Sequence, residues 1–364
     1  MGKRGRIQAW RKRGRKARER LRERLGMPTR KPIIIQPYHG FGTSDFVYVS
    51  GRVLRDRQII REQTDGVWRN FYNTYKRFVS RELANVALEV TFAGECFTTR
   101  TDEEGYFIVQ ERLSQPLTNW SSELSNPWQA ATVQLVDSRF TPPIVKTPAD
   151  VLVPGPQTSF GIISDIDDTI LKTYVTSWLK WRMIYLSIWQ NAFSRQAFTA
   201  VAPFFQALRR GPTGESYNPF FYVSNSPWNI YDQLEDFLRI NELPRGPIML
   251  RDFGLPYEQQ SRTFHGTKRQ RIERILQLYP ELSFVLIGDS GERDVDIYQA
   301  IFDNYPGRIL AIYIRDVRSV DRAVRVQKIL DQLPIPNLLV PHYRDAARHA
   351  AQHGLLDLTT FKTV

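Results

Sequence analysis

Residues 160–169, FGIISDIDDT, join an apolar run to three carboxylates within four residues and then to a hydroxyl. An apolar, β-branched run of this kind predicts a buried strand of a parallel sheet. Ligands of open α/β sheets bind at the carboxyl ends of the strands, so acids concentrated there indicate a chemical site. Because side chains two residues apart in an extended chain point the same way, we expect Asp165 and Asp167 to share one pocket.

The chain around and after this stretch alternates short apolar segments with amphipathic ones. Ser226 and Thr267 stand where N-caps of two of the helices are expected. Strands alternating with helices predict a doubly wound parallel α/β sheet. The expected strands are 160–164, 220–224, 248–250, 284–287 and 309–314, and the expected helices are 227–240, 268–279 and 318–333.

In the residues before this region, apolar and polar side chains alternate as they do in β-strands. The aromatic residues of 68–79 recur at helical spacing, and we interpret them as an insertion that packs on a small β-sandwich-like domain. Residues 31–42 are rich in Pro and Gly and read as a linker, and five prolines between residues 142 and 156 indicate a domain boundary. The expected strands are 46–54, 86–92, 96–100, 106–109 and 131–136.

These patterns predict four parts of the chain. We expect a basic amphipathic or disordered tail at 1–31, a β-rich domain at 32–155, a catalytic α/β domain at 156–341 and a C-terminal extension at 342–364. The last twenty or so residues carry no clear structural signal. A length of 364 residues is enough for two domains, each with its own core.

The net charge of +12 is confined to the tail. Residues 1–31 hold 14 Lys or Arg and two acids, whereas the other 36 basic and 36 acidic residues cancel. Apolar residues recur in the tail at three-, four- and seven-residue intervals, as in a helix that lies on anionic lipid. A disordered arm that binds nucleic acid is the alternative, and Ile7 and Trp10 favour an anionic phospholipid surface over nucleic acid.

Cysteine content and hydropathy restrict the cellular setting. Cys96 is the single cysteine, which excludes an intramolecular disulfide framework and indicates a reducing compartment. No apolar run follows the basic start, and none reaches the ~20 residues that a spanning helix needs. We therefore expect a cytoplasmic protein that associates with membranes peripherally.

Polar groups of complementary types follow three of the expected strands. Asp165 and Asp167 follow one, Ser224 and Asn225 follow the next, and the run 289–294 begins and ends with Asp. Lys268 opens a helix between the last two. Each group alone is a weak signal, but together they are what phosphoryl transfer through a covalent aspartyl phosphate requires.

Each of these groups has a role in that chemistry. A carboxylate attacks phosphorus only when a divalent cation such as Mg²⁺ neutralises the charge, and the predicted ligands are Asp165, Asp289 and the main-chain carbonyl of Asp167. The Asp167 side chain is the predicted proton donor to the leaving group. The Ser224 hydroxyl and the Lys268 ammonium are predicted donors to the phosphoryl oxygens. Supporting roles behind these groups are predicted for Thr169, Asn225 and Asp294.

The motifs resemble the four signature motifs of the haloacid dehalogenase superfamily: DxDxT at 165–169, Ser224, Lys268 and GDxxxxD ending at Asp294. More narrowly, SDIDDT, FYVSNSPW and VLIGDSGE, which start at residues 164, 221 and 285, are similar to the actin-patch-associated phosphatidate phosphatases, relatives of the lipins. The resemblance implies Mg²⁺-dependent hydrolysis of phosphatidate to diacylglycerol, with Asp165 as nucleophile and Asp167 as acid and base.

A segment rich in tryptophan follows the first motif. Nine of the twelve residues in 178–189 are apolar or aromatic, and Trp178, Trp181, Tyr185 and Trp189 lie on or near one helical face. Such a surface can enter the bilayer interface and admit acyl chains. A fully buried helix is the alternative, since helices that are hydrophobic all round are usually interior.

The function that we expect is a peripheral membrane phosphatidate phosphatase. A soluble phosphatase of a phosphoprotein or a small phosphomonoester fits the four motifs equally well. A third hypothesis is a non-catalytic scaffold that binds lipid or nucleic acid through the tail. A degenerate motif would favour this hypothesis, whereas all four motifs are filled in this sequence.

Overall fold

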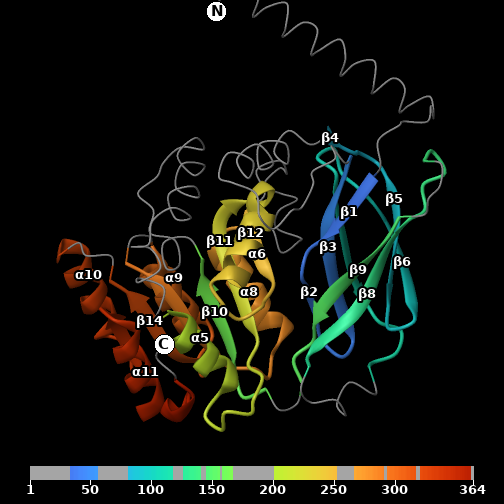
Figure 1. The fold of residues 1–364 in the computed structure, drawn as a ribbon. Coiled ribbons are helices and arrows are strands. Elements are labelled where there is room, and N and C mark those ends of the chain that lie inside the picture. The colour runs from blue at the N-terminus through green and yellow to red at the C-terminus, as the bar shows by residue number, and fades with distance from the viewer. Residues whose placement is uncertain are drawn as a thin grey trace, which may run out of the picture. The chain divides into compact units, whose positions relative to one another are not determined.

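The computed structural model describes residues 33–55, 81–117, 126–140, 145–155, 158–166, 201–251, 266–290, 293–316 and 320–361. These residues form a nine-stranded sheet and a six-stranded sheet with helices, a mixed α/β structure (Figure 1). The basic tail, the aromatic helix expected at 68–79 and the tryptophan-rich segment lie outside the described residues.

The nine-stranded sheet has the order β1-β3-β2-β9-β8-β5-β6, and β4 and β7 also pair with β3. Leu88, Val90 and Phe92 are buried along one side of β5 and alternate with less buried residues, the period of two that gives a strand one core face. The strands are β1 (Ile33–Pro37), β2 (Gly40–Gly42), β3 (Phe46–Arg55), β4 (Arg81–Glu82), β5 (Ala87–Phe92), β6 (Glu95–Arg100), β7 (Tyr106–Arg112), β8 (Trp128–Leu135) and β9 (Lys146–Leu152).

The region interpreted as a linker contains two strands, so that prediction was wrong. β1 and β2 lie within residues 31–42, where Pro and Gly had suggested a linker, and β2 pairs with both β3 and β9. β9 lies within the proline-rich stretch. Ala149 and Val151 are buried in it two residues apart, an alternation that the count of prolines concealed.

The six-stranded sheet is parallel throughout, as the sequence predicted, with the order β12-β11-β10-β13-β14-β15. The order reverses between β10 and β13, and every residue of these two strands is buried, as expected for strands covered on both faces. The strands are β10 (Gly161–Asp165), β11 (Phe220–Pro227), β12 (Ile248–Arg251), β13 (Phe284–Asp289), β14 (Ile309–Arg315) and β15 (Asn337–Val340).

The larger contacts between the α-helices of this region (Figure 1) form two sets. α8, α9 and α10 contact one another in series, and α11 packs on α5 and β15. The helical segments are α5 (Val201–Arg210), η1 (Trp228–Ile230), α6 (Tyr231–Ile240), α8 (Lys268–Leu278), α9 (Asp294–Asn304), α10 (Val320–Leu330), α11 (Tyr343–Gln352) and η2 (Leu358–Thr360).

One of the two predicted caps is confirmed and the other was wrong. Thr267 caps α8 and forms a capping box with Gln270. Ser226 does not cap a helix, because β11 continues to Pro227, which pairs with Arg251 after a shift in register. α6 starts only at Tyr231, after the single 3-10 turn η1.

The chain divides into two compact units, and the second contains residues 38–48, 111–129 and 150–364. Within it, Tyr38 stacks on Trp228 and Tyr231 with ring centroids 5.0 and 3.9 Å away. The Tyr279 hydroxyl donates to the main-chain carbonyl of Gly42 at 3.1 Å. Among the described residues, no helix has the length and apolar character needed to cross a membrane.

Candidate active site

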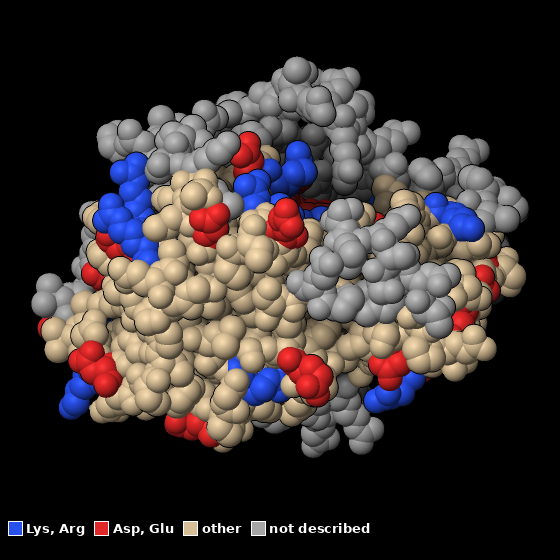
Figure 2. Space-filling view, turned by 90° about the horizontal axis from the view of Figure 1, so that it is seen from below, with Lys and Arg blue, Asp and Glu red and all other residues tan. Residues whose placement is uncertain are grey.

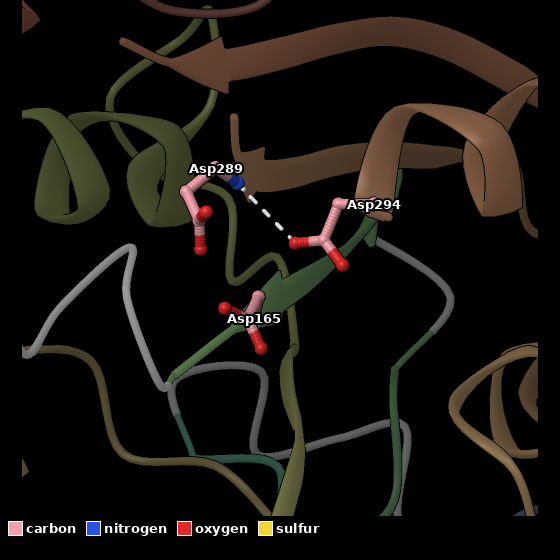
Figure 3. Close-up of side chains that lie close together, drawn as sticks. All are labelled: Asp165, Asp289 and Asp294. Carbon is pink, nitrogen blue, oxygen red and sulfur yellow. Dashed lines mark hydrogen bonds between the residues drawn. The ribbon is translucent and has the colours of Figure 1, made fainter. Parts of the chain in front are cut away.

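Three aspartates converge where the strand order of the parallel sheet reverses. Asp165 is the last residue of β10, Asp289 is the last residue of β13, and Asp294 begins α9. One carboxylate oxygen of each residue lies within 4.8 Å of one oxygen of the other two, and the side chains meet in one small space (Figure 3). All three residues have 0% exposure. The crevice at such a reversal is where open α/β sheets bind their ligands.

Lys268 joins these acids from the first turn of α8. Its Nζ lies 2.8 Å from Asp165 Oδ1 and also pairs with Asp294 Oδ1, and the side chain is only 2% exposed. The other oxygen of Asp294, Oδ2, accepts a hydrogen bond from the main-chain N–H of Asp289 at 3.2 Å. Asp294 therefore links the ammonium group to the end of β13.

Gly288 makes this arrangement possible. A Cβ atom at this position would lie 2.6 Å from Asp294 Oδ2 and 2.8 Å from Asp294 Cβ, closer than real Cβ atoms approach other atoms. The absence of a side chain immediately before Asp289 lets Asp294 reach back over the strand end.

The charges of the site fit a divalent cation. Three carboxylates and one ammonium sum to −2 within the set Asp165, Asp289, Asp294 and Lys268. Asp165 Oδ1 pairs with Lys268, and Asp165 Oδ2 accepts no hydrogen bond from the part of the chain that the structure describes. Buried charges are stable only when they are compensated, and clustered carboxylate oxygens are the ligands that Mg²⁺ prefers. The residues present therefore fit such an ion.

Ser224 lies within β11, beside the end of β10. Val223 pairs with Asp165 across the β10–β11 ladder, so Ser224 directly follows the residue opposite the aspartate. Ser224 is fully buried, and its Oγ accepts a hydrogen bond from the N–H of Ser226 at 2.9 Å. Asn225 is exposed, and its Oδ1 accepts from Arg271 Nη2 at 3.3 Å.

The structure thus brings together part of the predicted set. Asp165, Asp289, Asp294 and Lys268 form one cluster, and Ser224 lies in the neighbouring strand, β11. The other predicted residues lie outside the described ranges: Asp167, Thr169, Trp178, Trp181, Tyr185, Trp189 and Trp10.

Two tyrosines near the site were not predicted from sequence. Tyr298 of α9 donates to the carbonyl of Ile287 at 2.8 Å. Burial, and then the negative charge of Asp294, raise the pKa of Tyr298 well above its usual value, so it remains a neutral donor. Burial raises the pKa of Tyr343 to about 12. Tyr343 belongs to a helix whose other buried residues are alanines, too weakly apolar to predict a packed face.

These features define an α/β domain with a buried acidic site at a strand reversal. Residues 160–316 of it match the family described as phosphatidate phosphatase APP1, catalytic domain. This match and the first of the relatives below confirm, over this segment, the resemblance seen in the motifs.

Two relatives from yeasts are similar to parts of the chain. Phosphatidate phosphatase APP1 of Saccharomyces cerevisiae is 34% identical over 191 residues, which cover 50% of this chain and 31% of the relative. An uncharacterized protein of Schizosaccharomyces pombe is 29% identical over 224 residues, 61% of this chain and 35% of the relative. The chain therefore aligns with about a third of the length of each.

Among solved structures, a carbohydrate acetylesterase from Xanthomonas citri aligns over 90% of this chain and 72% of its own. Its sequence identity is 12% and its TM-score is 0.29, a value too low to indicate a common fold.

Proposed function

We propose that this chain is a Mg²⁺-dependent phosphatidate phosphatase that produces diacylglycerol and phosphate through an aspartyl phosphate on Asp165. The observation that carries the proposal is the buried cluster of Asp165, Asp289, Asp294 and Lys268 inside the segment that matches the catalytic-domain family. The strand order 3-2-1-4-5-6, counted from β10, supports a haloacid dehalogenase-like, doubly wound fold.

The proposed reaction has two halves. In the first, an Asp165 oxygen attacks phosphorus, the bond from phosphorus to the diacylglycerol oxygen breaks, and the leaving oxygen takes a proton from Asp167. In the second, water gives a proton to Asp167 and attacks the aspartyl phosphate. The bond from phosphorus to Asp165 then breaks, which releases phosphate and restores both side chains.

The described residues prepare the nucleophile for this chemistry. Lys268 orients Asp165 through its ion pair and adds positive charge where the phosphoryl group would arrive. Asp294 holds the Lys268 ammonium and the main chain of Asp289 at once, so the lysine keeps its place relative to the end of β13. Asp165, Asp289 and the main-chain carbonyl of Asp167 are the proposed ligands of Mg²⁺, with Asp294 close enough to hold one of its waters. Bound Mg²⁺ would offset the repulsion between carboxylate and phosphate.

The proposed setting is the cytoplasmic surface of an anionic membrane. Residues 1–31 supply the positive charge and Trp178 and Trp181 the apolar contact. On the face shown in Figure 2, acidic and basic side chains of the described residues lie interspersed. Because residues 1–31 hold all of the net positive charge, the tail is the part of the chain that we expect to respond to lipid charge.

Substrate class is tested with the full chain and Mg²⁺ against phosphatidate in detergent micelles, lysophosphatidate and p-nitrophenyl phosphate. We expect the highest kcat/KM with phosphatidate and loss of phosphate release when EDTA removes the cation. Activity confined to p-nitrophenyl phosphate would instead support a phosphatase of soluble phosphomonoesters.

Membrane association is tested by sedimentation with phosphatidate-containing and phosphatidylcholine vesicles. We expect binding to the anionic vesicles that weakens after deletion of residues 1–31 and after combined Trp178→Ala and Trp181→Ala. An intact chain that stays in the supernatant with both kinds of vesicle contradicts the peripheral membrane proposal.

A further inference from the structure

Arg271 is a fully buried arginine one helical turn after Lys268 on α8. Its Nη1 donates to two main-chain carbonyls, that of Ser224 at 2.5 Å and that of Met249 at 2.6 Å. Its Nη2 donates to the side chain of Asn225 at 3.3 Å. One guanidinium therefore connects α8 to β11 and β12 at the edge of the sheet where the acids lie.

The main-chain groups that Arg271 contacts flank an irregularity in the β11–β12 ladder. Val223 pairs with Met249, and the next pair is Pro227 with Arg251, so the register shifts between them. Residues 224–226 thus oppose only residue 250. A bulge interrupts the regular hydrogen bonds of a ladder and redirects side chains, and bulges are common beside active sites. Main-chain carbonyls in a buried bulge need other donors, which Arg271 supplies.

We propose that Arg271 is a positioning residue for phosphoryl transfer, which acts by holding this bulge so that Ser224 presents its hydroxyl beside Asp165. The inference rests on the proposed function, in which the Ser224 hydroxyl donates to the transferred phosphoryl group. Arg271 itself contacts the peptide carbonyl of Ser224, so it acts through that residue.

Two further observations support a role in placing Ser224. Burial of a guanidinium carries a large desolvation cost unless its donors are paired, so a fully buried Arg271 indicates a specific role for its hydrogen bonds. Lys268 and Arg271 also belong to the turn that the Thr267 capping box fixes. The cation that orients Asp165 and the cation that orients the bulge are therefore set by one rigid helix end.

The guanidinium geometry is what the bulge requires. Its planar fork of donors reaches the carbonyls of Ser224 and Met249 and the Asn225 amide at the same time. A lysine ammonium is a point charge without a fixed fork and cannot reproduce all three contacts. An error of about 1 Å in the placement of a reacting group can lower a rate by about 10²-fold.

The test is a double-mutant cycle in the full chain, with Arg271→Met, Ser224→Ala and the two combined. Phosphate release from phosphatidate and from p-nitrophenyl phosphate is measured with Mg²⁺. We expect each single variant to lower kcat by roughly 10²-fold with a much smaller change in KM, as for loss of one transition-state donor. In the Ser224→Ala background, Arg271→Met should lower kcat by no more than roughly threefold, because the hydroxyl that Arg271 positions is already absent.

Controls separate positioning from folding. Arg269→Met removes an exposed arginine of the same turn, paired with Glu273, and should leave kcat unchanged. Arg271→Lys retains the charge and replaces Arg271→Met in the cycle if the latter does not fold. We expect Arg271→Lys to lower kcat in the chain that retains Ser224. In the Ser224→Ala variant, we expect the same substitution to have little effect on kcat.

Orthovanadate binding by calorimetry in the same four proteins gives a readout that does not depend on turnover, and we expect the same non-additive pattern. Losses that simply multiply, in kcat or in orthovanadate affinity, would overturn the role of Arg271. A parent chain that binds orthovanadate but releases no phosphate from either substrate contradicts the proposed function, while the binding cycle still decides the role of Arg271.

Discussion

His39 lies between β1 and β2, and its imidazole is buried in the second unit with a side chain 14% exposed. Arg245 Nε donates to its Nε2 at 3.0 Å, and a Glu235 oxygen lies 3.2 Å from the same nitrogen. Burial first, and the Arg245 guanidinium second, lower the pKa of His39 from 6.5 to about 4, although Asp150 acts in the opposite direction. The folded protein therefore holds this imidazole neutral.

This pKa predicts a loss of stability in acid. Unfolded His39 takes up a proton near pH 6.5 and folded His39 only near pH 4, so the unfolded chain binds more protons between these values. Stability contributed by the neutral imidazole is present above pH 6.5 and falls as the pH falls through this window. The full loss is about 3 kcal/mol, of which about 2 kcal/mol develops between pH 7 and pH 5.

The assay is urea unfolding at pH 7 and pH 5, followed by tryptophan fluorescence, for the parent chain and for His39→Gln. Glutamine accepts a hydrogen bond from Arg245 but does not titrate, so the parent should lose about 2 kcal/mol more than the variant over this pH range. His353→Gln, which changes an exposed histidine, should behave as the parent does. An equal loss in the parent and in His39→Gln would refute the reasoning.

Three further predictions concern the site. Lys268→Met leaves the buried acids without their ammonium partner. We therefore expect the free energy of unfolding, measured with urea, to fall by roughly 3–5 kcal/mol and kcat to fall at least a hundredfold. Unchanged stability would contradict the ion-pair assignment. Gly288→Ala forces Asp294 away from the strand end, so kcat should fall. The control, Gly307→Ala, lies at an open turn and should change only stability. Equal kcat in both variants would show that Asp294 tolerates displacement. Mg²⁺ should raise the thermal midpoint of the parent and not of Asp289→Asn, as scanning calorimetry can measure; an equal rise in both would place the cation elsewhere.

Much of the parallel sheet and its acidic edge was predictable because both signals are local. A β-branched run that ends in carboxylates predicts a strand end with a site, and Thr267 before an amphipathic run predicts a capped helix. The alternation of strand and helix then predicts that the carboxyl ends share one edge, where Asp165 and Asp289 lie.

The features that were missed depend on contacts distant in sequence. Tyr38 and Gly42 belong to the second unit through their contacts with Tyr231 and Tyr279, and nothing in the Pro- and Gly-rich stretch indicates these partners. Ser226 has the sequence context of a helix cap, yet strand pairing resumes after it and overrides the local preference. A buried Arg271 was equally unpredictable, because its partners are main-chain carbonyls.

The central claim is that Asp165 is the nucleophile of a Mg²⁺-dependent phosphatidate phosphatase. Its most direct test is phosphate release from phosphatidate by the full chain and by Asp165→Asn and Asp167→Asn, with Mg²⁺ and with EDTA. We expect Mg²⁺-dependent release by the parent chain and loss of turnover in both variants, with Mg²⁺ binding retained by Asp167→Asn. Near-normal release by Asp165→Asn, or none by the parent chain, would contradict the account.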